Sequence, residues 1–237
     1  VDHYTYVIMG DGCNQEGVAS EACSLAGHLG LGKLIALYDD NHITIDGNTD
    51  VSFTEDVLKR YEAYGWHVQH VADGNTDVDG IARAIEAAKA VTDRPSLIKV
   101  TTTIGYGSPN KSNTAGVHGA ALGAEEAALT RQALDWPYAE FEVPQAAYDH
   151  WRQAVDRGAA AEASWNETLA AYRANYPSEA AQFERQLRGE LPEGWDANLP
   201  AYTAADKGLA TRMHSYNCLN AIAPNLPELI GGSADLT

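Results

Sequence analysis

The sequence predicts an α/β protein built on a doubly wound parallel sheet, and two observations support this prediction. First, short apolar runs alternate with segments of helical periodicity over roughly the first half of the chain. Second, the apolar runs at residues 6–9 and 34–38 each end in a polar motif, Gly10-Asp11-Gly12 and Asp39-Asp40-Asn41. The intervening residues suffice for a crossover helix, so both strands are expected to end at one edge of the sheet.

The other elements of this region follow in order. The periodicity predicts helices at residues 16–29, 52–64, 78–91 and 123–134, with strands at 66–71 and 97–102. Ser52 and Glu55 have the spacing of a capping box for the second helix, and Gly65 is expected to end it. Residues 104–119 are rich in glycine and contain His118, which is typical of an ordered functional loop.

The last part of the chain has a different pattern. Residues 144–189 are rich in alanine and charged residues, and we expect two helices broken near Pro177. An extended linker at 191–200 precedes a predicted helix at 204–223 and a strand beginning at Leu229. Because both ends of the chain lie next to predicted strands, we expect a fragment of a longer protein.

Composition excludes several classes of function. The 237 residues carry 33 Asp and Glu against 16 Lys and Arg, a net charge of −17, which disfavours binding to nucleic acids or anionic membranes. No apolar run is long enough to cross a bilayer. The three cysteines form no CxxC pair and are odd in number, which favours a reducing compartment over a disulfide framework.

The two polar motifs predict a site for a divalent metal and a diphosphate. Mg²⁺ prefers oxygen ligands and keeps positions for phosphate and water. Asp11 offers a carboxylate, Asn41 an amide oxygen and the following turn a carbonyl. Gly12 allows the backbone to approach a phosphate, and the helix beginning near Glu16 can direct its N-terminus there. GDG alone is often only a turn, and the second motif is what favours a metal site.

Four strings resemble the transketolase family, most nearly its plant and green-algal members: GDGCNQEGVASEACSLAGHLGLGKLIALYDDN, TTTIGYGSPNK, VHGAALG and GGSADLT. The resemblance implies a thiamine diphosphate-binding fold with Mg²⁺ or Ca²⁺ as the metal. It implies Asp11, Asn41 and the carbonyl of Ile43 as metal ligands. It also implies Gly12 as a diphosphate contact and Asn41 as a further cofactor-binding residue. Glu16 matches a cofactor-binding glutamate that joins the cofactor-activating glutamate in a carboxyl network at the subunit interface.

The same resemblance implies further site residues. Ile45 and Ile104 match apolar residues that pack on the cofactor rings. His118 matches a catalytic histidine that lies near the reactive carbon of the cofactor and binds both the cofactor and the substrate. Arg212 matches an arginine that binds the sugar phosphate, and Asp235 lies in a string near the cofactor. Without the resemblance, His118 would more often be a structural histidine and Arg212 a solvated surface charge.

The implied organisation has three parts: residues 1–135 from the diphosphate-binding domain, a helical connector at 136–200, and the start of a pyrimidine-binding α/β domain at 201–237. The implied function is reversible transfer of a two-carbon ketol unit from a ketose phosphate to an aldose phosphate, in the Calvin cycle or pentose phosphate pathway. The enzyme would be a homodimer with its active site between subunits, located in the chloroplast stroma or alternatively the cytoplasm.

Two alternatives remain open at this point. One is a sibling thiamine diphosphate enzyme, dihydroxyacetone synthase or phosphoketolase. The other is a non-catalytic protein that keeps the cofactor fold. We also expect that the 237 residues on their own are inactive.

Overall fold

The computed structural model describes residues 2–233 and divides between Phe141 and Glu142 into two compact units. The first unit contains a four-stranded sheet in the order β1-β2-β6-β5, and every pair of neighbours is parallel. The strands are β1 (Thr5–Gly10), β2 (Leu34–Asp40), β5 (His67–Val71) and β6 (Ser96–Thr101). This confirms the predicted parallel α/β fold.

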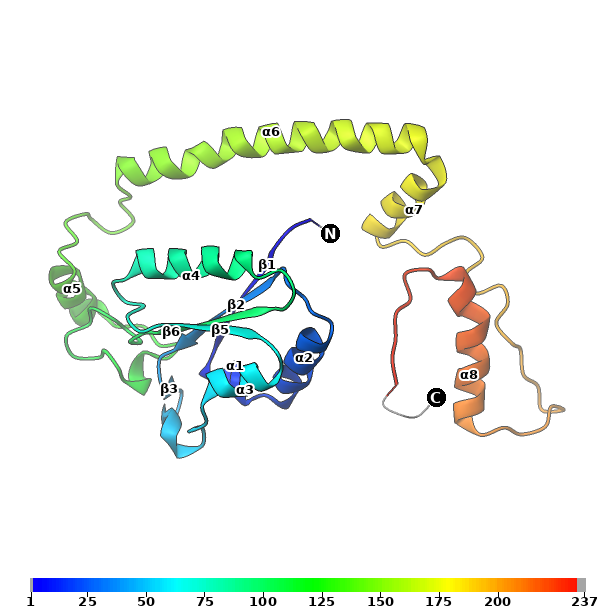
Figure 1. Cartoon of the computed structure of the whole chain (residues 1–237), viewed down its shortest axis with the longest axis horizontal. Coiled ribbons are helices and arrows are strands. Elements are labelled where there is room, and N and C mark those ends of the chain that lie inside the picture. The colour runs from blue at the N-terminus through cyan, green and yellow to red at the C-terminus, as the bar shows by residue number, and fades with distance from the viewer. Residues whose placement is uncertain (1, 234–237) are drawn as a thin grey trace. The chain divides into compact units, whose positions relative to one another are not determined.

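Helices cover both faces of the sheet (Figure 1). On one face, α2 (Gly17–His28) and α3 (Val57–Ala63) bury Ala26 and Tyr61 against Met9, Ala36 and Leu97 of the strands. On the other face, α4 (Val78–Ala90) packs against β2, β5 and β6 in a second core cluster. Near-complete burial of the central strands requires the continuous apolar runs seen in the sequence.

The register of the sheet brings the two polar motifs together. Gly10 lies beside Asp39 across β1 and β2, and Asp40 lies beside Thr101 across β2 and β6. Because the strands are parallel and end at nearly the same level, the residues that follow them gather at one edge. Helix α1 (Asp11–Gln15) begins directly after β1, and this short helix was not predicted.

Two other small elements lie near this edge. A hairpin of β3 (Ile43–Thr44) and β4 (Gly47–Asn48) occupies the region predicted only as a polar turn, and the 3₁₀ turn η1 (Thr49–Val51) follows it.

The predicted capping box at Ser52 and Glu55 is wrong. Helix α3 begins five residues after Ser52, and its N-cap is Asp56, whose side chain accepts a hydrogen bond of 3.2 Å from the Lys59 amide. An aspartate is as good an N-cap as a serine, so the sequence offered two competing starts for this helix. The η1 turn occupies the residues just before Ser52 and delays the helix.

The second unit contains helices α6 (Gln145–Asn175), α7 (Pro177–Leu187) and α8 (Thr211–Ile222), followed by the 3₁₀ turn η3 (Ala223–Asn225). The predicted break at Pro177 is confirmed, since this proline is the first residue of α7. Trp165 of α6 and Phe183 of α7 pack edge to face, 6.1 Å between ring centroids.

Two predictions for this unit are wrong. Helix α8 begins seven residues later than predicted, because the segment before Thr211 forms turns in which Asp206 accepts hydrogen bonds from Thr203. Leu229 and Ile230 form no strand. The division of the chain at residues 135 and 200 stays a prediction.

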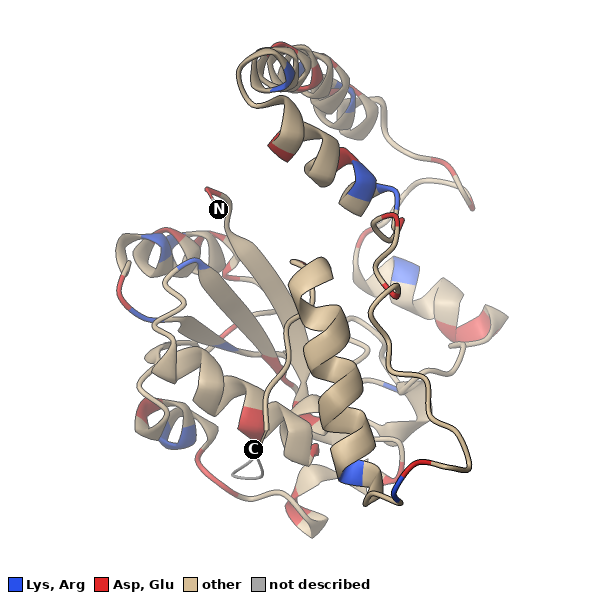
Figure 2. Ribbon diagram, turned by 90° about the vertical axis from the view of Figure 1, so that its right-hand side faces the viewer, with Lys and Arg blue, Asp and Glu red and all other residues tan. Residues whose placement is uncertain are grey.

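Acidic residues are more numerous than basic ones and are distributed over both units, as the net charge requires (Figure 2). In residues 2–233, no helix combines the length and the apolar composition needed to cross a membrane.

The loop predicted at residues 104–119 is ordered by one buried acid. It contains the 3₁₀ turn η2 (Ala115–Val117) and leads to α5 (Ala124–Ala133). Glu126 of α5 accepts hydrogen bonds from the Ser108 hydroxyl, from the Asn110 amide at 2.8 Å and from the Asn110 side chain at 2.9 Å. These bonds, led by the one from Ser108, lower the pKa of Glu126 to about 2.

We therefore predict that Glu126→Gln destabilises the protein in a pH-dependent way. Because the pKa of Glu126 is lowered in the folded state, its contribution is complete above its ordinary pKa of 4.5 and is lost as the pH falls towards 2. Thermal unfolding of the variant and the parent protein should differ most at pH 7, and the difference should shrink below pH 4.5. A difference that is constant from pH 7 to pH 3 would contradict this assignment.

Candidate functional site

A cleft of about 880 Å³ opens at the carboxyl edge of the sheet, within the first unit. It is formed by the end of β1, helix α1, the turn after β2, the β3–β4 hairpin and the loop after β6. Eight of the residues singled out from the sequence line it: Asp11, Gly12, Glu16, Asn41, Ile43, Ile45, Ile104 and His118. The structure thus gathers in one place residues that are spread over more than 100 positions of the chain.

Asp11 is buried at the base of this cleft, with only 4% of its surface exposed. The hydroxyl of Tyr38 donates a hydrogen bond to Asp11 Oδ1, and the His42 amide donates to Asp11 Oδ2 at 3.0 Å. Burial, reinforced by the hydrogen bond to Asp11, raises the pKa of Tyr38. Its phenol therefore keeps its proton and acts as a donor at neutral pH.

A second buried carboxylate, Asp40, lies behind the first. Its Oδ1 is 3.2 Å from the Tyr38 hydroxyl. Its Oδ2 accepts a hydrogen bond of 2.9 Å from the Thr101 hydroxyl and forms an ion pair of 3.0 Å with Lys99. Lys99 brings a positive charge to a region that holds two buried carboxylates, those of Asp11 and Asp40. A buried charge is tolerated only with such partners.

The turn after β2 places Asn41 and Ile43 in the lining of the cleft. His42 has a φ of 62°, in the left-handed region, which reverses the chain directly after Asn41. The Asn41 side-chain oxygen accepts a hydrogen bond of 3.0 Å from the Ile43 amide, and the Asn41 amide group donates to Asp39 at 3.3 Å. Both bonds hold the Asn41 side chain in one orientation.

The residues present fit a divalent metal bound together with a diphosphate. A carboxylate, an amide oxygen and a backbone carbonyl form a hard, all-oxygen donor set of the kind that Mg²⁺ and Ca²⁺ prefer. Residues 2–233 contain no cluster of three or more His, Cys, Asp or Glu suited to a metal. A site with these three protein ligands leaves coordination positions for phosphate and water, an arrangement typical of Mg²⁺ sites.

Space for the diphosphate is present beside Gly12. A Cβ atom added at this position would meet nothing within 4 Å, although the residue lines the cleft. The absence of a side chain leaves the backbone of α1 open to a phosphate. Glu16, the N-cap of α2, also faces the cleft, and its side chain makes no capping hydrogen bond.

Apolar surface and a histidine line the rest of the cleft. Ile45 is 72% exposed and lines the cleft, so it is available to pack on an aromatic ring. Ile104 is half-buried at the start of the long loop, and His118 is exposed at its end, directly after η2. The two isoleucines predicted to contact the cofactor rings and the histidine predicted to bind the substrate therefore line one cavity.

Two predicted site residues are not brought to this cleft by the described structure. Arg212 is an exposed residue of α8, which belongs to the second unit, and its role in binding a sugar phosphate stays a prediction. Asp235 lies outside the described residues.

Sequence reasoning missed the residues that support Asp11. Tyr38, Lys99 and Thr101 lie on strands and have no motif of their own. The strand alternation offered one signal, since Tyr38 and Asp40 are two residues apart and must share a face of the sheet. That this face meets Asp11 follows only from the pairing of β1 with β2.

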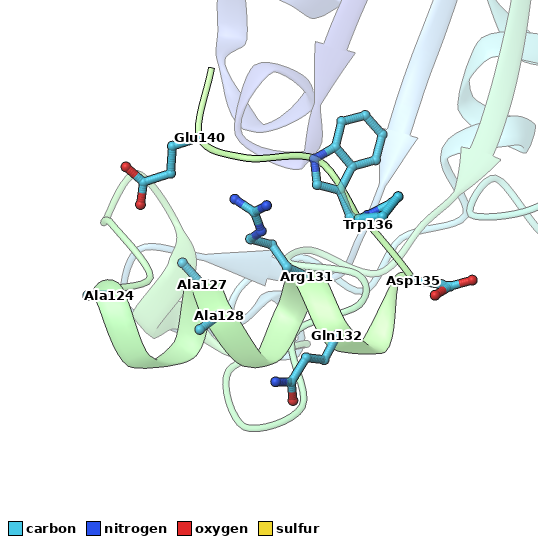
Figure 3. Close-up of a pocket in the computed structure, with 9 residues that line it drawn as sticks. Ala124, Ala127, Ala128, Arg131, Gln132, Asp135, Trp136 and Glu140 are labelled. Carbon is cyan, nitrogen blue, oxygen red and sulfur yellow. The ribbon is translucent and has the colours of Figure 1, made fainter. Parts of the chain in front are cut away.

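A second cleft, of about 640 Å³, runs along α5 and the segment after it. Figure 3 shows Arg131 extending from the helix into the space that Trp136 and Glu140 border. No residue that the sequence marked as functional lines this second cleft.

Comparison with known proteins adds an independent test. A family model described as the thiamine diphosphate-binding domain of transketolase matches residues 1–192. A transketolase from Nostoc sp. is 70% identical over 237 residues, and a chloroplastic transketolase from Zea mays is 60% identical over 236. Each alignment covers all of this chain and 35% of the relative, so the chain spans about a third of these relatives' length.

Solved structures agree with the sequence matches. A transketolase from Pichia stipitis in complex with sedoheptulose 7-phosphate is 50% identical, with a TM-score of 0.87, and the match covers 99% of this chain and 35% of that one. A transketolase from Leishmania mexicana is 48% identical, with a TM-score of 0.89, over 100% and 35% of the two chains. With its α/β fold and the family model matched over most of its length, the chain belongs to the transketolase family and carries its thiamine diphosphate-binding domain.

Proposed function

We propose that the full-length protein is a transketolase, a transferase that moves a two-carbon ketol unit reversibly from a ketose phosphate to an aldose phosphate. The observation that carries this proposal is the single cleft that gathers Asp11, Gly12, Asn41, Ile45 and His118. Membership of the transketolase family supports the same reaction. Sugar phosphates are the proposed substrates, and the structure from Pichia stipitis holds one such compound.

The residues of the cleft have distinct proposed roles. Asp11, the Asn41 side chain and the Ile43 carbonyl bind a divalent cation, Mg²⁺ or Ca²⁺. Gly12 leaves room for the diphosphate that shares this cation. The cofactor, when bound, supplies the carbanion chemistry needed to break and form carbon–carbon bonds.

The other residues orient the reactants. Ile45 and Ile104 pack against the rings of the cofactor, so that its position in the cleft is fixed. His118 lies on the ordered loop and exchanges protons with hydroxyl groups of the sugar, a task suited to an imidazole near neutral pH. Glu16 takes part in a carboxyl network, and Arg212 and Asp235 contribute to the complete site.

The proposal includes a homodimer with the active site between the subunits. Val18 and Leu25 of α2 are 68% and 55% exposed, and this helix follows directly after Glu16, which lines the cleft. Such exposed apolar residues are typical of surfaces that another chain covers. Nucleic acids and membranes are not among the proposed partners, because the chain is strongly acidic.

The proposed location is the chloroplast stroma, with a role in the Calvin cycle and the pentose phosphate pathway. Relatives from Zea mays and Spinacia oleracea are named as chloroplastic, which supports a plastid enzyme. The relative from Nostoc sp., at higher identity, carries no compartment in its name, and the cytoplasm is the alternative location.

The direct test is ketol transfer by the full-length protein. With xylulose 5-phosphate as donor and ribose 5-phosphate as acceptor, we expect turnover that requires both thiamine diphosphate and a divalent cation. Removal of the metal with a chelator should abolish the reaction, and added Mg²⁺ should restore it. Absence of transfer between these sugars would overturn the proposal, and assays with the substrates of dihydroxyacetone synthase and phosphoketolase would then separate the sibling enzymes.

Gly12→Ala should weaken thiamine diphosphate binding without destabilising the fold. The new methyl group would occupy open space on the cleft side, and alanine is favoured over glycine within a helix. We expect cofactor affinity, measured by calorimetry in the presence of Mg²⁺, to fall about tenfold, a loss of about 1.4 kcal/mol.

Gly17→Ala is the matched control for this variant. A Cβ at Gly17 also meets nothing within 4 Å, but Gly17 does not line the cleft. Its cofactor affinity should equal that of the parent protein. Equal affinities for the Gly12 and Gly17 variants would remove Gly12 from the diphosphate site.

His118→Ala should impair the reaction but not the binding of the metal. Because a positioned acid or base contributes roughly 10²-fold or more to a rate, kcat/KM should fall by about that factor. The affinity for Mg²⁺ should stay unchanged, as should the unfolding temperature, since the side chain is exposed. His28→Ala, an exposed histidine outside the cleft, serves as control, and an equal loss in both variants would contradict the role of His118.

A further inference from the structure

We propose that Tyr38 is a positioning residue for the metal site, because its hydroxyl fixes the carboxylate of Asp11 in the orientation that binds the divalent cation. The inference rests on the proposed function, in which Asp11 is a metal ligand. It adds a residue that lies on a strand, outside both polar motifs and outside the cleft.

The contact between the two side chains is direct and shielded from water. Tyr38 is 1% exposed and Asp11 is 4% exposed, and the tyrosine hydroxyl donates its hydrogen bond to Asp11 Oδ1. The other carboxylate oxygen accepts a hydrogen bond from the His42 amide. With one donor on each oxygen, the plane of the carboxylate is set before any cation arrives, and each oxygen keeps a further lone pair for a metal.

Tyr38 is itself held in place from two sides. Its ring belongs to the core cluster that α2 and α3 cover, together with Ala36, Leu97 and Trp66. Its hydroxyl lies 3.2 Å from Asp40 Oδ1, and the other oxygen of Asp40 is bound by Lys99 and Thr101. A chain of polar contacts therefore runs from β6 across β2 to α1, and it ends at the proposed metal ligand.

This arrangement has a consequence for metal affinity. A carboxylate that is free to rotate must be ordered when the cation binds, and the ordering costs free energy that a preset carboxylate does not lose. Removal of a side chain that orients a metal ligand by a hydrogen bond typically lowers the metal affinity by roughly 10- to 100-fold. Tyr38 has the geometry of such a residue, because it touches the ligand and stands on the side away from the cleft.

The test compares two tyrosines of the same core in the full-length protein. Tyr38→Phe removes only the hydroxyl that contacts Asp11 and leaves the ring. Tyr61→Phe is the control, since Tyr61 is also 1% exposed and donates a hydrogen bond of 2.9 Å, but to the Asn14 side chain. Asn14 stays held in that variant by Arg60, which donates to its backbone carbonyl at 3.0 and 3.1 Å.

Mg²⁺ affinity, measured by calorimetry at a fixed thiamine diphosphate concentration, is the first readout. We expect it to fall about tenfold or more in Tyr38→Phe and to stay within about twofold of the parent in Tyr61→Phe. Both variants lose one buried hydroxyl, so both should lower the unfolding temperature by a few degrees. The second readout is kinetic: for Tyr38→Phe, the Mg²⁺ concentration giving half-maximal rate should rise, while kcat at saturating Mg²⁺ stays near that of the parent.

Equal Mg²⁺ affinities for the two phenylalanine variants would overturn the inference, because the hydroxyl of Tyr38 would then serve stability alone. Asp11→Asn separates this outcome from a failure of the proposed function. If that variant binds Mg²⁺ as the parent does, then Asp11 is not a metal ligand and the assignment of the site itself is wrong.

A second variant keeps the inference testable should Tyr38→Phe fold poorly. Thr101→Val removes the hydroxyl that holds Asp40 and leaves the contact between Tyr38 and Asp11 in place. Its Mg²⁺ affinity should fall, but by less than that of Tyr38→Phe, because it acts one step further along the chain of contacts. An unchanged affinity would contradict the role of these contacts.

Discussion

The burial of two carboxylates, Asp11 and Asp40, at the carboxyl edge of the sheet is the constraint on which the site depends. A buried carboxylate loses its hydration, and that loss must be offset by hydrogen bonds or opposite charge. Here the offset comes from the Tyr38 hydroxyl, the His42 amide, the Thr101 hydroxyl and the Lys99 ammonium group. Among these four partners, Lys99 alone carries a full positive charge, against the two negative charges of Asp11 and Asp40. Binding of the proposed cation would balance the remaining negative charge.

The parallel sheet supplies these partners without a dedicated motif. Strand β2 lies between β1 and β6, so its last residues face Asp11 on one side and Thr101 on the other. An antiparallel sheet would place these strand ends at opposite edges. The same geometry explains why ligands of open α/β sheets collect beyond the carboxyl ends of strands. In this protein it also explains why the support for the metal site lies in the core.

The loop after β6 depends on a different buried acid. Glu126 accepts hydrogen bonds from Ser108 and Asn110 of the loop. The segment that carries His118 is therefore held against the first turn of α5. The cleft therefore has two anchored sides: the ends of β1 and β2, fixed by the contacts of Asp11, and the loop, fixed by Glu126. Ile45, in the turn of the hairpin, is 72% exposed and lines the cleft, where it is accessible to a ligand.

The amino-acid sequence by itself determined the four strands of the parallel sheet, most of the helices and the two polar motifs. Burial on both faces of a parallel sheet demands continuous apolar runs that end in turn residues. It also indicated Asp11, Gly12, Asn41 and His118 through local strings. The sequence offered two competing caps for α3, and it did not show that the helix begins after Asp56. The late start of α8 depended on turns that local periodicity does not reveal. Only the tertiary structure decided which residues support the site, because the contacts of Tyr38 with Asp11 and of Lys99 with Asp40 follow from strand order and register, which join residues far apart in the chain.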